Sequence, residues 1–95
     1  MAEPETVKVI VKGRVQGVYY RAFTKTIADS LNLTGFVKNL RNGNVEALVQ
    51  GDKIKLDQLL ARLRRGPEAA VVDSVTIECL KSDVQYREFV IIDDI

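Results

Sequence analysis

The feature that most restricts the fold is a change of hydrophobic period across a short segment with a glycine at each end. Residues 7–12 place a valine at every second position, as does a strand with one buried face. After the segment 13–17, Phe23, Ile27 and Leu31 recur at every fourth position, as on one side of a helix. The sequence therefore predicts a strand, a loop with unusual backbone angles and a helix in immediate succession.

The rest of the chain shows the same two periods. Asn42-Gly43 predicts a hairpin turn, because both residue types tolerate a positive φ angle. Asp52 is a candidate cap for a second helix, which Gly66-Pro67 would end. The apolar positions of that helix are Leu56, Leu59, Leu60 and Leu63, which share one side. The remaining alternating or apolar segments predict strands over residues 34–39, 45–50, 72–79 and 89–92.

The order of elements is therefore β-α-β-β-α-β followed by a short C-terminal strand. That order predicts an α+β fold of the ferredoxin-like (split β-α-β) type, a sandwich in which an antiparallel sheet carries two helices on one face. With 95 residues, the chain is expected to form a single domain over 1–95, in which residues 1–5 are disordered. Order alone does not assign a function, since many activities share this fold.

Two residue types that carry much of protein chemistry are almost missing. The chain has no histidine and one cysteine, Cys79. It therefore has no Ser-His triad, no histidine metal ligand, no internal disulfide and no Cys-x-x-Cys site. Cys79 lies in an alternating apolar stretch, where we expect a core thiol rather than a nucleophile.

Charge and hydropathy indicate where such a chain works. Its 14 basic and 13 acidic side chains leave a net charge of +1, without the basic excess that nucleic-acid binding usually requires. The N-terminal residues are acidic and polar, and they lack the basic start and apolar core of a signal peptide. No stretch approaches the roughly 18 apolar residues of a membrane span. We therefore expect a cytoplasmic protein that binds neither nucleic acid nor membrane.

The segment 13–21 carries the strongest chemical indication. Backbone N–H groups at a helix start lack intrahelical partners and carry the positive end of the helix dipole, so they favour an anion. Arg21 adds a planar fork that matches two phosphate oxygens. The predicted phosphate site consists of the backbone of Val15, Gln16, Gly17, Val18, Tyr19 and Tyr20 with the side chain of Arg21. Taken alone, the Gly-x-x-x-Gly run favours a tight turn with a surface arginine, and the loop lacks the Gly-Lys-Ser/Thr ending of a nucleotide P-loop.

Val15 limits the chemistry that this loop can do. Cysteine-dependent phosphatases also hold phosphate in a backbone loop that ends in arginine, with the nucleophilic cysteine six positions earlier. That position is Val15 here. A phosphate in this loop would meet no covalent nucleophile, so water would have to attack it directly.

Two separated motifs resemble those of the acylphosphatase family. The pattern Gly-Arg-Val-Gln-Gly-Val-x-aromatic-Arg stands at residues 13–21, and Gly-aromatic-Val-basic-Asn stands at residues 35–39. Later segments around Gly43, Gly51 and Gly66-Pro67 fit the same family. The resemblance therefore covers essentially the whole chain.

This resemblance implies an enzyme that hydrolyses acyl phosphates to a carboxylate and inorganic phosphate, without a metal or cofactor. It implies that Arg21 and the loop backbone hold the phosphoryl group and that Asn39 positions the attacking water. An amide does not accept a proton near pH 7, so Asn39 would orient water through its carbonyl oxygen rather than act as a base. A carboxylate leaves easily and needs no general acid. Inorganic phosphate is expected as product and competitive inhibitor.

Several alternatives stay open. The chain could be a catalytically idle domain that serves as a binding or regulatory module. An RNA-binding module of the same fold would stack bases on aromatic residues of its first and third strands, and neither strand has one here. Asn39 alone would fit a strand-end residue that bonds its own backbone. We expect a monomer. The acidic residues 93–94 differ from the basic and aromatic ending common in the family, and they would alter anion affinity if the tail closes over the loop.

Overall fold

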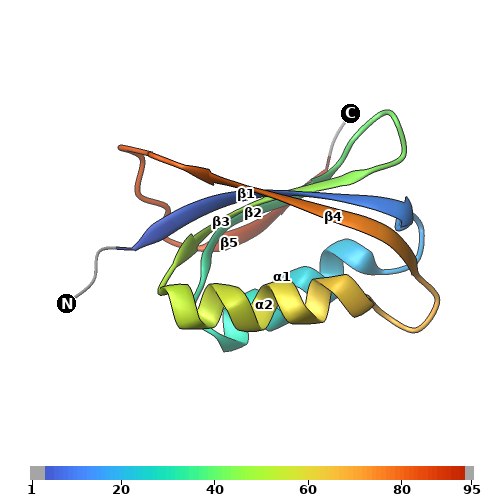
Figure 1. Cartoon of the computed structure of the whole chain (residues 1–95), viewed down its shortest axis with the longest axis horizontal. Helices are drawn as coiled ribbons and strands as arrows, with labels where there is room; N and C mark the ends of the chain where they lie inside the picture. The colour runs from blue at the N-terminus through green and yellow to red at the C-terminus, as the bar shows by residue number, and fades with distance from the viewer. Residues whose placement is uncertain (1–3, 94–95) are drawn as a thin grey trace.

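The computed structural model describes residues 4–93 and arranges them in two layers, with the sheet in one and both helices in the other (Figure 1). The strands are β1 (Glu5–Arg14), β2 (Thr34–Asn39), β3 (Val45–Gly51), β4 (Val71–Leu80) and β5 (Phe89–Ile92), and the helices are α1 (Tyr20–Ser30) and α2 (Lys53–Arg65). This is the predicted ferredoxin-like order with its extra strand. Glu5, which was expected to be disordered, begins β1, and residues 1–3 lie outside the described residues.

The sheet has the strand order β4-β1-β3-β2-β5. β1 pairs antiparallel with β3 and with β4, and β2 pairs antiparallel with β3. The prediction of an antiparallel sheet is wrong for one pair, because β5 runs parallel to β2 and makes the sheet mixed. The reason is the connection through residues 81–88, which carries the chain from the β4 edge to the opposite edge of the sheet. β1, β2 and β5 therefore all finish at the same end of the sheet.

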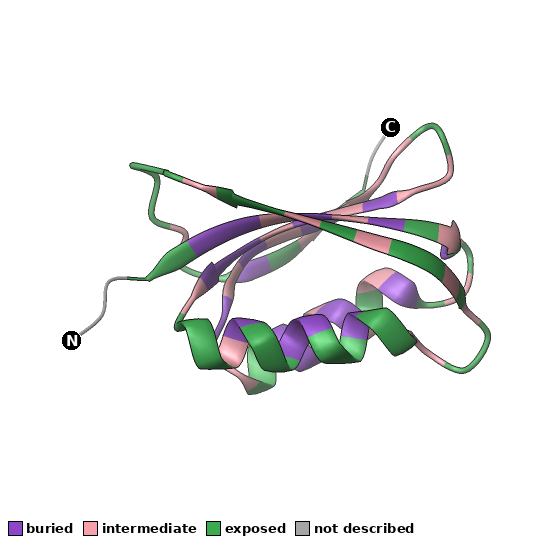
Figure 2. Cartoon of the chain, viewed as in Figure 1, coloured by how far each residue is buried: buried purple, intermediate pink, exposed green. Residues whose placement is uncertain are grey.

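The core lies between the sheet and the helices, where the inward faces are buried (Figure 2). Val7, Val9 and Val11 of β1 are buried as predicted, and so are the four leucines of α2. The buried side of α1 is instead formed by Tyr20, Thr24, Ile27 and Ala28, while Phe23 and Leu31 are only partly buried. Short side chains such as that of Ala28, which is fully buried, let the helix approach the sheet closely.

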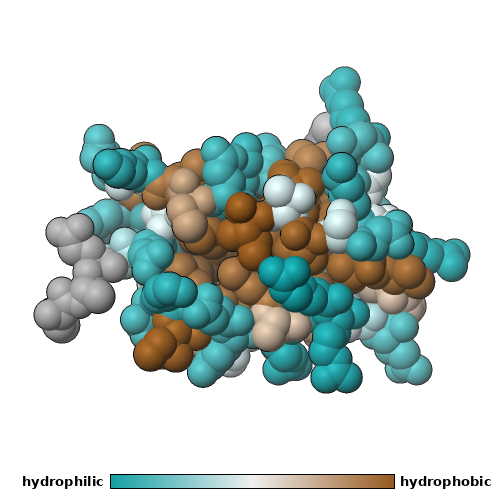
Figure 3. Space-filling view, viewed as in Figure 1, coloured by the Kyte–Doolittle hydropathy of each residue, from teal (hydrophilic) through white to brown (hydrophobic). Residues whose placement is uncertain are grey.

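Cys79 is exposed, so the prediction of a core thiol is wrong. The physical reason is the position of β4 at the edge of the sheet, where no residue of the strand is fully buried. Val72, Val75 and Ile77 of β4 only partly cover the core. Apolar surface is correspondingly visible between β4 and α2 in the space-filling view (Figure 3).

A buried hydroxyl joins the start of α1 to the end of α2. The hydroxyl of Tyr20 donates a hydrogen bond of 2.7 Å to the carbonyl oxygen of Leu63. The helical partner of that carbonyl would be the N–H of residue 67, which is a proline and has none. Tyr20 therefore supplies the donor that Pro67 lacks. Burial also raises the pKa of the Tyr20 phenol well above its ordinary value.

We expect Tyr20→Phe to lower the free energy of unfolding by about 1–3 kcal/mol at pH 7, because the Leu63 carbonyl would lose its donor. Above about pH 10 the phenol ionises in the unfolded chain before it does in the folded one, so the unfolded state binds fewer protons and stability falls as pH rises. Urea unfolding at pH 7 and pH 11 should show a smaller alkaline loss in the variant than in the wild type. Tyr86→Phe is the control and should lose as much stability at pH 11 as the wild type. An equal loss in Tyr20→Phe and in the wild type would show that Tyr20 does not cause the alkaline destabilisation.

Candidate active site

A pocket lies where the β1–α1 loop meets the ends of β2 and β5. Its volume is about 460 Å³. The lining residues are Val15, Gly17, Tyr19, Tyr20, Arg21, Ala22, Asn39, Ile91 and Asp93. The common direction of β1, β2 and β5 brings these three chain segments to one end of the sheet. Arg21 and Asn39, which are far apart in the sequence, thus line one cavity, as do four of the six predicted loop residues.

The other two predicted loop residues, Gln16 and Val18, do not line the pocket. Val18 is partly buried and packs against the core, so it anchors the loop. Gln16 directs its side chain toward the β2–β3 hairpin, where its Nε2 donates to the carbonyl oxygens of Leu40 and Asn44 at 2.7 and 2.8 Å. The sequence predicted only a backbone role for Gln16, because nothing in a linear pattern shows that the hairpin lies beside the loop.

The loop backbone is shaped by two residues with positive φ angles. Gly17 has φ 75°, and Tyr19, which precedes α1, has φ 66°. Val15 is 1% exposed and anchors the loop in the core. Within residues 4–93, the N–H groups from Gln16 to Ala22 find no hydrogen-bond acceptor. A run of unpaired N–H groups at a helix start favours an anion, and the binding of phosphate by this loop stays a prediction.

The guanidinium of Arg21 lies beside the C-terminal end of β5. Its Nη1 donates to the carbonyl oxygen of Ile92 at 3.1 Å and lies 3.4 Å from Oδ1 of Asp93. The Arg21 side chain is 29% exposed, whereas that of Asp93 is 93% exposed. The end of β5 thus contacts Arg21 through an exposed backbone carbonyl and an exposed carboxylate. Sequence patterns identified Arg21 but placed neither Asp93, Ile91 nor Ala22 in the site.

Asn39 brings an unpaired acceptor to the pocket. It is the last residue of β2, paired with Val45 of β3, and its Oδ1 is buried without a hydrogen-bond partner. A buried acceptor without a partner costs about 1–3 kcal/mol. Oδ1 of Asn39 is the one such side-chain atom within residues 4–93. Its position in the pocket lining fits an acceptor that is completed by a water or by a ligand donor.

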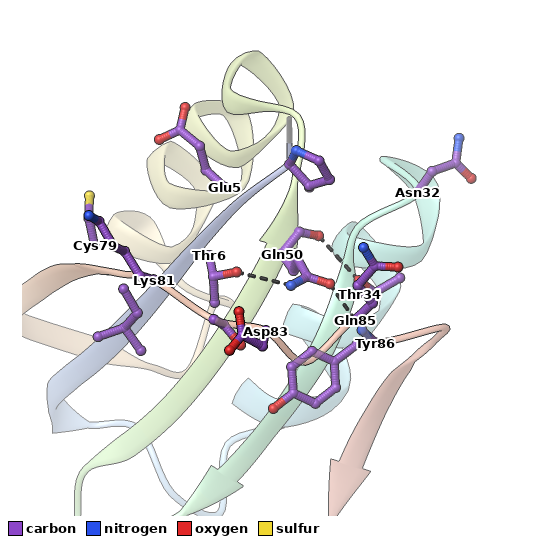
Figure 4. Close-up of a pocket in the computed structure, with 14 residues that line it drawn as sticks. Glu5, Thr6, Asn32, Thr34, Gln50, Cys79, Lys81, Asp83, Gln85 and Tyr86 are labelled. Carbon is purple, nitrogen blue, oxygen red and sulfur yellow. Dashed lines mark hydrogen bonds between the residues drawn. The ribbon is translucent and has the colours of Figure 1, made fainter. Parts of the chain in front are cut away.

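A second cavity, of about 750 Å³, lies at the opposite end of the sheet (Figure 4). The buried side-chain amide of Gln50 lines this cavity. Its Nε2 donates to Thr6 Oγ1 at 3.0 Å and to the Val84 carbonyl at 2.9 Å, and its Oε1 accepts from the N–H of Tyr86 at 3.0 Å. The bonds to Val84 and Tyr86 attach the β4–β5 connection to the sheet. None of the predicted site residues lines this cavity.

Within residues 4–93, no three histidine, cysteine, aspartate or glutamate side chains are grouped so that they could hold a metal ion. No helix in that range is both long and apolar enough to cross a membrane. Among the residues of 4–93 that line the pocket, Arg21 is the one with a basic side chain, and it lies beside the unpaired N–H groups of the loop.

Fold and pocket together define the class: a ferredoxin-like α+β domain whose pocket lies between its first βα loop and the ends of its second and last strands. The acylphosphatase family model matches residues 7–91, and the chain belongs to the acylphosphatase family.

Known proteins resemble the chain over nearly its whole length. An acylphosphatase of Bordetella parapertussis is 48% identical over 88 residues, which cover 93% of this chain and 94% of that protein. The crystal structure of acylphosphatase from Bacillus subtilis superposes with a TM-score of 0.90 at 31% identity, covering 94% of this chain and 99% of that one. An acylphosphatase structure from Coxiella burnetii gives a TM-score of 0.88 at 35% identity, covering 94% and 93%.

We expect Asp93→Asn to strengthen the binding of inorganic phosphate by about two- to fivefold at low ionic strength. The Asp93 carboxylate lies 3.4 Å from the Arg21 guanidinium and competes with an anion for it. An exposed ion pair is worth only about 0.2–1 kcal/mol, and salt screens it, so the difference should fade in 0.5 M salt. Isothermal titration with phosphate measures the effect. The matched change at the far end of the sheet, Asp83→Asn, should leave the affinity unchanged, and weaker binding by the Asp93 variant would refute the prediction.

Proposed function

We propose that the chain hydrolyses acyl phosphates to a carboxylate and inorganic phosphate, by direct in-line attack of water on a phosphoryl group held by the loop 15–21. The observation that carries this proposal is that one cavity contains both a set of hydrogen-bond donors for an anion and a hydrogen-bond acceptor for a water. A run of unpaired N–H groups lies beside the Arg21 side chain, and an unpaired acceptor, Asn39 Oδ1, lines the same pocket. The first fits an anion, and the second fits a water.

In the proposed reaction the phosphoryl oxygens bind the loop N–H groups and Arg21. Phosphoryl transfer spreads negative charge over these oxygens, so fixed N–H dipoles and a guanidinium stabilise the transition state without reorganising. Val15 is buried and offers no nucleophile at the position where cysteine-dependent phosphatases have theirs, so the proposed attack is made by water. The loop is held in place before substrate binds, because Val15 and Val18 are anchored in the core.

Asn39 has the role of orienting water. Oδ1 accepts a hydrogen bond from the water and directs its oxygen toward phosphorus. The water oxygen forms the new P–O bond, and the bond between phosphorus and the acyl oxygen breaks. The carboxylate departs with the electron pair, and the proton released from water passes to phosphate or solvent. Because a carboxylate is a stable leaving group, the reaction needs neither a general acid nor a metal.

The partners follow from this chemistry. The substrate is a small acyl phosphate, and inorganic phosphate is both product and competitive inhibitor. We propose that the protein works as a monomer in the cytoplasm, without cofactor, nucleic acid or membrane.

The test is the hydrolysis of benzoyl phosphate by the wild-type protein in the presence of EDTA, followed by the loss of its ultraviolet absorbance. We expect a rate far above spontaneous hydrolysis, unchanged by the chelator and inhibited competitively by inorganic phosphate. A rate no higher than the spontaneous one would instead favour an idle binding domain. A rate abolished by EDTA and restored by a divalent cation would contradict the metal-free mechanism.

A further inference from the structure

The side chain of Gln16 joins the phosphate loop to the β2–β3 hairpin. Its Nε2 donates at 2.7 Å to the Leu40 carbonyl and at 2.8 Å to the Asn44 carbonyl. Two carbonyl acceptors can be satisfied only by the amino end of an amide, so the orientation of the side chain follows from its partners. Within residues 4–93, these are the only hydrogen bonds between the loop 15–19 and the hairpin.

Both acceptors belong to the base of the hairpin turn. The N–H of Leu40 donates to the Asn44 carbonyl at 2.8 Å, and the N–H of Gly43 donates to the Leu40 carbonyl at 3.2 Å. The Gln16 amide therefore adds a third and a fourth bond to two carbonyls that already close the turn. Gln16 therefore binds a turn that is already closed by its own hydrogen bonds.

That turn begins next to the proposed water-orienting group. Asn39 immediately precedes Leu40, and its ladder partner Val45 immediately follows Asn44. Gln16 thus binds the carbonyls adjacent to both members of the last β2–β3 pair. Because Gln16 belongs to the loop that would hold phosphate, its side chain sets how far Asn39 stands from that loop.

We infer that Gln16 is a positioning residue, whose side-chain amide aligns the water held by Asn39 with a phosphorus atom in the loop. This inference rests on the proposed function. It assigns the side chain a task distinct from the backbone N–H contact with phosphate. A loss of this amide should leave phosphate binding nearly intact, because the N–H groups and Arg21 are held independently by the core and by the tail. The rate of the chemical step should fall.

Gln16→Met tests this, because methionine keeps the length of the side chain and removes the donor. Gln16→Glu keeps the shape of the side chain but replaces the donor with a carboxylate oxygen, which repels the carbonyl oxygens of Leu40 and Asn44. Gln58→Met, on the exposed side of α2, is the matched control. We expect the Gln16 variants to lower kcat for benzoyl phosphate by about 10²-fold, the loss that a misplacement of about 1 Å can cause. The inhibition constant for inorganic phosphate should change by less than about threefold in Gln16→Met, which adds no charge, and the control should match the wild type.

A merely structural role for Gln16 predicts a different pattern. It would weaken phosphate binding in step with kcat, or lower the melting temperature below that of the assay, and either result would overturn the inference. An unchanged kcat in both Gln16 variants would overturn it as well. In an Asn39→Ala background, Gln16→Met should cost less than about threefold more, since the positioned group is gone. A full additional loss there would contradict the assignment.

These outcomes separate the inference from the proposed function. If the wild type does not hydrolyse benzoyl phosphate, the proposed function fails. If the wild type is active but the Gln16 variants equal it, only the positioning role fails. The Asn39 side-chain NH₂ resonances give a readout that needs no activity: they should shift in Gln16→Met and stay in place in Gln58→Met.

Discussion

Replacing Arg21 with methionine is expected to lower kcat/KM for benzoyl phosphate by about 10³-fold or more. Methionine keeps an apolar stem of similar length, but it removes the only basic side chain among the residues of 4–93 that line the pocket. Arginines that stabilise the charge of a transferring phosphoryl group contribute about 10³–10⁵-fold in rate. Inhibition by inorganic phosphate should weaken at the same time, because the loop N–H groups would then bind the anion without a cation. Steady-state kinetics with a phosphate inhibition series measures both effects.

Two further variants make this result specific. Arg64→Met removes an exposed arginine on α2 and should leave the kinetics unchanged. Arg21→Lys keeps the charge but loses the planar fork, so it should recover only part of the rate. A catalytic rate for Arg21→Met within about threefold of wild type would mean that the loop amides suffice and that Arg21 serves mainly to hold the tail.

Asn39→Ala is expected to lower kcat by about 10²-fold or more while leaving the inhibition constant for phosphate almost unchanged. The water would lose its acceptor, whereas the phosphate-binding loop would keep all its groups. The free energy of unfolding should not decrease, because the change removes a buried acceptor that has no partner. Kinetics and urea unfolding on the same samples measure the two effects.

Thr34→Ala, at the other end of β2, controls for changes to the strand itself. A destabilised Asn39→Ala variant would show that the amide makes structural bonds in solution, in favour of a strand-end residue that bonds its own backbone. A variant that is stable, binds phosphate and still hydrolyses benzoyl phosphate at the wild-type rate would remove Asn39 from the mechanism.

The sequence predicted each helix and strand because hydrophobic periods report local burial. The direction of β5 was missed, since a period shows which side of a strand is buried but not which edge of the sheet the strand joins. Cys79 was misplaced for a related reason. The residues around Cys79 alternate as in a half-buried strand, yet on an edge strand the side that faces the helices is only partly covered by them.

The site was predicted as far as its residues form contiguous motifs. Arg21 and Asn39 line one pocket as the two motifs implied, and their catalytic roles stay predictions. The partners of Gln16 could not be predicted, because Leu40 and Asn44 lie 24 and 28 residues away and are met through backbone carbonyls that carry no sequence signal. Asp93 was anticipated only as part of an acidic tail, since its approach to Arg21 depends on the parallel course of β5.

The parallel course of β5 also has a practical consequence for attaching a reporter group to the protein. β1 begins at the end of the sheet away from the pocket, whereas β5 finishes beside Arg21 (Figure 1). A reporter group attached at Asp93 would therefore lie next to the proposed phosphate site, and one attached at Glu5 would lie at the far end. Labelled protein for activity assays should accordingly carry its label at the start of β1.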